Sequence, residues 1–183
     1  MELSADRASG VAVPSVSTVH AFHAGVGAPI DASTGIRWIE NNRRVASGEV
    51  ISYTIRAATL QRILELPGCV GISLQYGVDD LGETLLLPIG VNGDGLVIGG
   101  SVPAGAKRFT RRYTGTVKGH FFGSDTFTRL LDERRSEIMR ATPALDDDHA
   151  PQLLLSDAAE KEPRVYEDRS FPCASACPSL PEV

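Results

Sequence analysis

Cysteine and histidine residues near the two ends of the chain have the types and spacing of a metal or redox site. Cys173 and Cys177 are separated by three residues in a proline-rich segment. Two thiolates at this spacing can bind zinc or form a reversible disulfide. A zinc site needs four ligands, and His20 and His23 complete that set only if the N-terminal segment meets the C-terminal one. Free thiols without a role fit the same residues, so both interpretations stay open.

Acidic residues in two predicted turns have the chemistry of a site for a hard cation. Asp79 and Asp80 form one pair, and Asp146, Asp147 and Asp148 form a longer run. Clustered carboxylates bind calcium or magnesium. Hairpin turns favour Asp, Asn and Gly for backbone reasons alone, so we predict that these residues are structural.

A thiol enzyme would need Cys69 beside a histidine, and the candidates are His120 or His149 from the second half of the chain. Cys69 begins an apolar strand, and a small buried hydrophobic residue is the favoured interpretation. The sequence contains no P-loop, nucleophile elbow, zinc-protease helix or dinucleotide fingerprint. Catalytic residues are therefore unknown, no cofactor is favoured, and an enzyme is the less favoured class.

A basic stretch with interleaved aromatic residues has the composition of a surface for nucleic acid, phosphate or an acidic partner. Its basic residues are Lys107, Arg108, Arg111, Arg112 and Lys118. The same spacing fits a polar strand paired with residues 116–122. Because the net charge is −5, a nucleic-acid partner is unlikely, and the chain's own acidic tail or another subunit is the expected mate.

Length and composition indicate a globular protein. The 183 residues are 42% hydrophobic and 22% charged, ordinary values for a folded domain. The N-terminus lacks the basic and apolar regions of a secretory signal, no segment has the roughly 20 apolar residues of a membrane span, and three cysteines make no disulfide framework. We expect a soluble cytoplasmic protein with no membrane partner.

Hydrophobic periodicity predicts one strand–helix–strand–strand unit used twice, in residues of about 50–98 and 117–158. Shifting the chain by 67 residues aligns Thr59 with Thr126 and Leu64 with Leu131, and the two acidic turns with each other. The fold class is therefore α+β, with antiparallel sheet and short helices packed on it. Ser124 is expected to cap the second helix. Charges between Arg134 and Thr142 predict an edge or distorted strand in the second copy.

Outside these units the composition predicts less regular structure. Residues 1–30 are expected to form an extended N-terminal arm, residues 31–158 a single domain beginning with a helix capped by Ser33 or Thr34, and residues 159–183 an irregular tail anchored by Val165, Tyr166 and Phe171.

The middle of the chain resembles an uncharacterised family of small bacterial proteins. The resemblance lies in residues 63–72, which include Pro-Gly-Cys-Val-Gly-Ile, in the acidic turn of residues 76–82, and in the leucine strand and turn of residues 86–95. The Cys/Pro segment at residues 171–178 is similar in character. Pro88 within the leucine strand and Asn92 in place of the usual Asp depart from the pattern. The resemblance implies no activity, and Pro88 predicts an edge or a bulge at that point.

Three classes of function remain. A non-enzymatic interaction or assembly module, binding a protein partner or another copy of the chain, is favoured by the repeated units and the expected strand edges. A small-ligand or metal-binding protein using the acidic turns or terminal cysteines is the first alternative, and an enzyme with an unrecognised thiol or acid–base site is the second.

Overall fold

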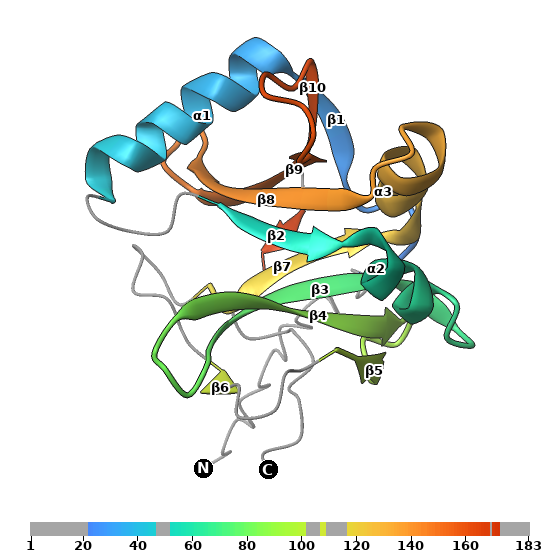
Figure 1. The fold of residues 1–183 in the computed structure, drawn as a ribbon. Helices are drawn as coiled ribbons and strands as arrows, with labels where there is room; N and C mark the ends of the chain where they lie inside the picture. Colours follow the sequence, from blue (N-terminus) through green and yellow to red (C-terminus); the bar gives the residue numbers. More distant parts are fainter. Residues whose placement is uncertain (1–21, 47–51, 102–106, 109–116, 169, 173–183) are drawn as a thin grey trace, which may run out of the picture.

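The computed structural model describes residues 22–46, 52–101, 107–108, 117–168 and 170–172. These residues form an α+β fold in which helices pack on two antiparallel sheets (Figure 1). The predicted fold class is therefore confirmed.

Sheet A has the strand order β1-β10-β9-β8-β2 and all its pairs are antiparallel. Its strands are β1 (Ala28–Asp31), β2 (Tyr53–Arg56), β8 (Ile138–Leu145), β9 (Pro151–Asp157) and β10 (Val165–Asp168).

Sheet B has the order β11-β7-β3-β4-β5, and β6 pairs with the end of β3 beyond β7. Its strands are β3 (Cys69–Val78), β4 (Thr84–Asn92), β5 (Val97–Gly100), β6 (Lys107–Arg108), β7 (Gly119–Gly123) and β11 (Phe171–Pro172).

The helices are α1 (Ala32–Val45), α2 (Ala57–Leu64) and α3 (Ser124–Phe127), which continues into the π-helical turn η1 (Thr128–Glu133). The order strand, helix, strand, strand occurs as β2-α2-β3-β4 and again as β7-α3-η1-β8-β9. In each unit the first strand lies in a different sheet from the last two strands. β2 pairs with β8 in sheet A, and β7 pairs with β3 in sheet B. That the two units are copies of one ancestor stays a prediction.

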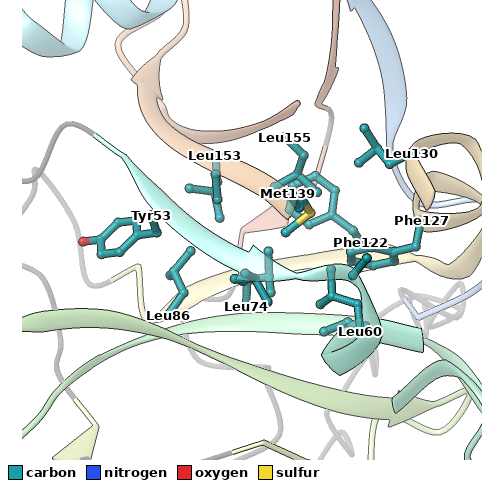
Figure 2. Packing of buried hydrophobic residues seen from close by; sticks show 14 of the residues in the cluster. Tyr53, Leu60, Leu74, Leu86, Phe122, Phe127, Leu130, Met139, Leu153 and Leu155 are labelled. Atoms are coloured by element: carbon teal, nitrogen blue, oxygen red, sulfur yellow. The ribbon is translucent and has the colours of Figure 1, made fainter. Parts of the chain in front are cut away.

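The main core lies between the sheets and receives residues from both units (Figure 2). Leu60 of α2 and Phe127 of α3 are both fully buried in it. Alternation along each strand supplies the rest, for example Met139 and Ala141 from β8 and Ile72 and Leu74 from β3.

Helix α1 covers part of the other face of sheet A. Its Trp38 and Ile39 pack against Ala144, Leu154 and Tyr166 of the sheet. Gly35 permits this approach, because a Cβ atom there would lie 2.2 Å from the Tyr166 ring.

The structure corrects several predicted elements. The cap of α1 is Asp31, which accepts a hydrogen bond from the Thr34 amide, rather than Ser33 or Thr34. Ser124 is the first residue of α3 and Gly123 occupies the cap position without a side-chain hydrogen bond.

Strand β8 is an interior strand between β9 and β2, so the predicted edge or distorted strand is wrong. The charges that suggested an edge lie largely before its first residue, Ile138. Arg140 alternates with the buried Met139 and Ala141 and therefore faces away from the core.

The predicted arm and tail both contain strands. β1 lies at the end of the predicted arm, and β10 and β11 lie within the predicted tail. β1 pairs with β10 and β11 with β7. Composition alone missed them because each is short and its partner is distant in sequence.

Pro88 lies where the pairing of β4 with β5 ends. Its carbonyl accepts a hydrogen bond from the Ser101 amide at 3.0 Å, whereas the last paired residues are Ile89 and Gly100. The missing N–H points to the same side as that carbonyl, so the ladder to β3 continues through Pro88 without a shift.

None of the described helices is long and apolar enough to cross a membrane.

Candidate functional site: a basic pocket on sheet A

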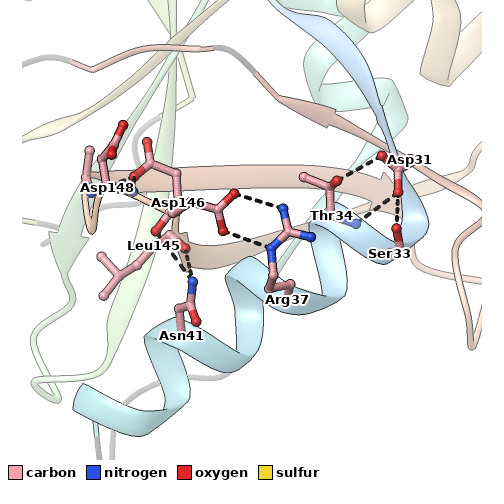
Figure 3. Close-up of polar contacts among 10 residues, drawn as sticks. Asp31, Ser33, Thr34, Arg37, Asn41, Leu145, Asp146 and Asp148 are labelled. Atoms are coloured by element: carbon pink, nitrogen blue, oxygen red, sulfur yellow. Dashed lines mark hydrogen bonds and ion pairs between the residues drawn. The ribbon is translucent and has the colours of Figure 1, made fainter.

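In both predicted acidic turns a carboxylate is bonded to backbone amides of the same turn, and Figure 3 shows the second turn. One carboxylate oxygen of Asp146 accepts from the amides of Asp148 at 3.0 Å and Ala150 at 2.8 Å, and the other accepts from the Gln152 side chain at 2.8 Å. Asp79 in the first turn accepts from two amides in the same way, each at 2.9 Å. These carboxylates order the turns.

Asp147 is paired with Arg37 of α1 through two hydrogen bonds of 2.8 Å (Figure 3). The hydrogen bond from Arg37 lowers the pKa of Asp147, and Asp147 raises the pKa of Arg37. The side chains of Asp80 and Asp148 are exposed. Within the described ranges, no three His, Cys, Asp or Glu side chains are grouped to hold a metal ion.

The terminal cysteine–histidine hypothesis falls mostly outside the described residues, because Cys173, Cys177 and His20 lie there. His23 is exposed, and its Nδ1 accepts a hydrogen bond from the Gly25 amide at 3.2 Å.

The structure does not bring Cys69 and His120 together. His120 lies opposite Leu74 of β3, and the five residues from Leu74 to Cys69 span about 16 Å of extended strand. The Cys69 thiol donates to the Gly71 carbonyl at 3.3 Å, and burial raises its pKa. His149 lies in the exposed acidic turn. A Cys69–His120 dyad is therefore excluded.

His120 is fully buried and oriented by its neighbours. Its Nδ1 lies 2.9 Å from the Ser170 hydroxyl, and its ring meets Tyr76 edge to face at 6.2 Å between centroids. Burial lowers the pKa of His120 to about 3. An enclosed neutral imidazole supports packing rather than proton transfer to a substrate.

The described part of the basic stretch does not form the predicted pairing with residues 116–122. Lys107 and Arg108 form β6 and pair with Val78 and Gly77 of β3 rather than with residues 116–122. The Lys118 carbonyl accepts from the Tyr76 amide at 3.0 Å. Arg111 and Arg112 lie outside the described residues.

A different group of basic residues forms a pocket of about 320 Å³ on the outer face of sheet A. It combines three cationic side chains, four hydroxyl groups and a small apolar wall. The lining residues are Arg43, Lys161 and Arg140, the hydroxyl residues Ser52, Thr142, Ser156 and Tyr166, and the apolar residues Ile39 and Pro163.

The sheet register explains why these side chains meet. Arg140 and Thr142 alternate with core residues of β8 and face outward. Ser156 of β9 is the register partner of Arg140. The C-terminal half of α1 supplies Ile39 and Arg43 to the same space.

The charges that line the pocket are positive, although the nearby Glu160 carboxylate also acts on Tyr166. Arg140 donates to the backbone carbonyls of Ala158 at 2.7 Å and Glu160 at 3.2 Å, and no carboxylate among the described residues forms an ion pair with it. Arg43 pairs with Glu40 at 2.7 Å, where both side chains are about half exposed, so this pair is weak.

The hydroxyls are placed beside these charges. Burial raises the pKa of Tyr166, and the nearby charges of Arg140 and Arg43 oppose that rise. Ser156 is 0% exposed, and its hydroxyl has no hydrogen-bond partner in the described part of the chain. The arrangement can bind an anion through charge-assisted hydrogen bonds.

Sequence reasoning missed this pocket because its cations come from α1, β8 and the segment after β9. The available signal was the outward alternation of Arg140 and Thr142, in the segment that we expected to be a degraded strand. No protein-family model, curated protein or solved structure matches this chain.

Proposed function

We propose that this chain is a non-enzymatic interaction module that binds an acidic group of a protein partner in the basic pocket. The observation that carries the proposal is the joint placement of Arg43, Arg140 and Lys161 around hydroxyl groups in one cavity. A carboxylate or phosphate on the partner's surface would receive hydrogen bonds from these donors.

The short sheet edges favour this site over edge-to-edge pairing. The edge strands β1, β2 and β5 each contain four residues, and β1 contains a proline. Short edges and proline disfavour pairing between sheets. The strand edges that the sequence suggested as an assembly surface therefore contribute less than the pocket.

The acidic turns no longer favour a metal-binding protein, because Asp79 and Asp146 are bonded to backbone amides and Asp147 to Arg37. The separation of Cys69 from His120 weighs against a thiol enzyme. We also propose that the chain acts in the cytoplasm of a bacterial cell and that it belongs to the uncharacterised family that its sequence resembles.

Capture of partners by matched variants tests the proposal. The wild-type chain, the double variant Arg43→Gln/Lys161→Gln and the control Arg44→Gln are immobilised, and proteins retained from extracts of the source cells are quantified by mass spectrometry. Arg44 is exposed on the same helix and does not line the pocket. We expect a partner that the wild type and Arg44→Gln retain and the double variant loses by about tenfold.

Two further measurements make the result decisive. Retention should fall with added salt, because screening weakens exposed charge pairs. Light scattering on the purified chain distinguishes another copy as the partner, since a pocket-dependent dimer would dissociate in the double variant. Retention that is equal for all three chains, with no pocket-dependent dimer, rejects the proposal.

A further inference from the structure

The N-terminus of α2 opens onto a second cavity of about 350 Å³, away from the basic pocket. Its lining residues are Ala57, Ala58, Gln61, Leu131, Arg135, Ser136 and Glu137. They come from the first turns of α2, from η1 and from the segment between η1 and β8.

The first turn of α2 has no side-chain cap. Arg56 occupies the cap position and forms no capping hydrogen bond. The Ala57 amide donates to the Glu137 carbonyl at 2.9 Å, but no described residue accepts from the Ala58 amide. The free amide and the positive end of the helix both favour an anion here.

An independent observation supports a ligand. Ser136 lines the cavity, is only 4% exposed, and its hydroxyl has no hydrogen-bond partner among the described residues. Buried hydroxyls are normally bonded, so a ligand oxygen would satisfy this group.

Arg135 adds a positive charge to the same cavity. It adopts a φ of 54°, a backbone conformation that a residue other than glycine rarely adopts, and its side chain is exposed at the rim. Glu137 opposes the anion with its own carboxylate, but this side chain is exposed and therefore well solvated.

We infer that this cavity is a binding site for the phosphate group of a small molecule. The donors are the Ala58 amide, the Ser136 hydroxyl, the Gln61 side chain and the Arg135 guanidinium, and Leu131 and Ala57 supply an apolar wall for the organic part. The volume is at the lower end of that found for small-molecule sites. This site does not depend on the basic pocket or on the proposed protein partner.

A titration followed by two-dimensional ¹H–¹⁵N NMR tests the site on the full chain. Inorganic phosphate and phenyl phosphate are added at constant ionic strength, with sodium chloride as the reference. We expect saturable shifts at the amides of Ala58 and Ser136 in phosphate only. Tighter binding of phenyl phosphate indicates an organic ligand, and equal binding indicates free phosphate as the ligand.

Matched variants distinguish binding from folding. Arg135→Gly removes the charge and suits the positive φ, so we expect phosphate affinity to fall about tenfold without a loss of thermal stability. Glu137→Gln should raise the affinity, and Ser136→Ala should lower it.

The control Arg44→Gln removes an exposed cation that lines neither cavity and should leave phosphate affinity at this site unchanged. Shifts that follow chloride equally, shifts confined to the basic pocket, or an unchanged affinity in Arg135→Gly overturn the inference. Failure of partner capture by the basic pocket leaves these measurements unaffected.

Discussion

The N-termini of α1 and α2 differ in whether a side chain caps their free backbone amides. At α1, Asp31 accepts from the Thr34 amide at 3.0 Å and from the Thr34 hydroxyl at 2.8 Å, as well as from Ser33 (Figure 3). The Ser33 hydroxyl and the Thr34 amide hold the pKa of Asp31 well below its usual range. At α2, a cation, Arg56, occupies the equivalent position and caps nothing.

Other polar groups of the molecule also differ in whether the chain itself supplies their hydrogen-bond partners. Asp146 and Glu167 are satisfied by groups of the chain itself, whereas the hydroxyls of Ser136 and Ser156 have no partner among the described residues. The satisfied groups fix turns and strands. The hydroxyls of Ser136 and Ser156 line cavities that contain cationic side chains, whereas the Thr84 hydroxyl, which also has no partner among the described residues, lines neither of them. A missing hydrogen-bond partner therefore indicates availability to a ligand only where the group also lines a cavity, as Ser136 and Ser156 do.

Replacing Glu167 by Gln should give the largest loss of stability among the satisfied groups. Glu167 is fully buried and accepts from Arg129 at 2.8 and 3.0 Å and from Arg134 at 2.8 Å. Removing its charge leaves two partly buried cations unpaired, which we expect to cost about 3 kcal/mol.

Urea unfolding of Glu167→Gln and Glu40→Gln measures this difference. Glu40 pairs with Arg43 at 2.7 Å on the surface, and its replacement should cost less than about 0.5 kcal/mol. Equal losses for the two variants would show that the buried carboxylate has no special role in holding β10 to η1.

Acid should destabilise the chain through His120. Its pKa near 3 lies below the ordinary value of 6.5, so between these values the unfolded chain binds a proton that the folded chain does not. Stability therefore falls as the pH decreases, by about 2.5 kcal/mol between roughly pH 7 and pH 4.5. The lowered carboxylate pKa values of Asp31 and Asp147 act only at lower pH.

The variant His120→Gln checks the origin of this slope. Gln does not titrate, so the free energy of unfolding should change much less over the same pH interval, whatever its absolute value. A slope that is the same in the variant would assign the pH dependence to another group.

The local patterns of the sequence predicted the central elements well. The strand–helix–strand–strand order predicted for residues of about 50–98 is found as β2-α2-β3-β4, and the apolar strand predicted to begin at Cys69 is β3. These signals are local, because burial of one face repeats within a few residues. The structural role of the acidic turns also followed from turn chemistry, as Asp79 and Asp146 show.

Pairing between distant segments could not be predicted in this way. The exchange of β2 and β7 between the sheets depends on which edge each strand meets, and local periodicity carries no information on that choice. The basic pocket depends on the same register, since Arg140 and Ser156 are brought together by β8 and β9. The cavity at α2 was missed because its signal is the absence of a capping residue at Arg56.

Removing the cap of α1 and adding one to α2 tests the difference between the two helix N-termini. These changes have the smallest expected effect on stability. Asp31→Ala removes the cap of α1 and should cost about 1 kcal/mol, and Arg56→Asn should stabilise α2 by a few tenths to about 1 kcal/mol. Thermal unfolding of both single variants measures these changes. Arg56→Asn should also weaken phosphate binding at α2, because its side chain would compete for the free amides, whereas Asp31→Ala should leave that binding unchanged. A gain in stability with undiminished phosphate binding would show that the open N-terminus of α2 is a tolerated defect and that the anion is held elsewhere.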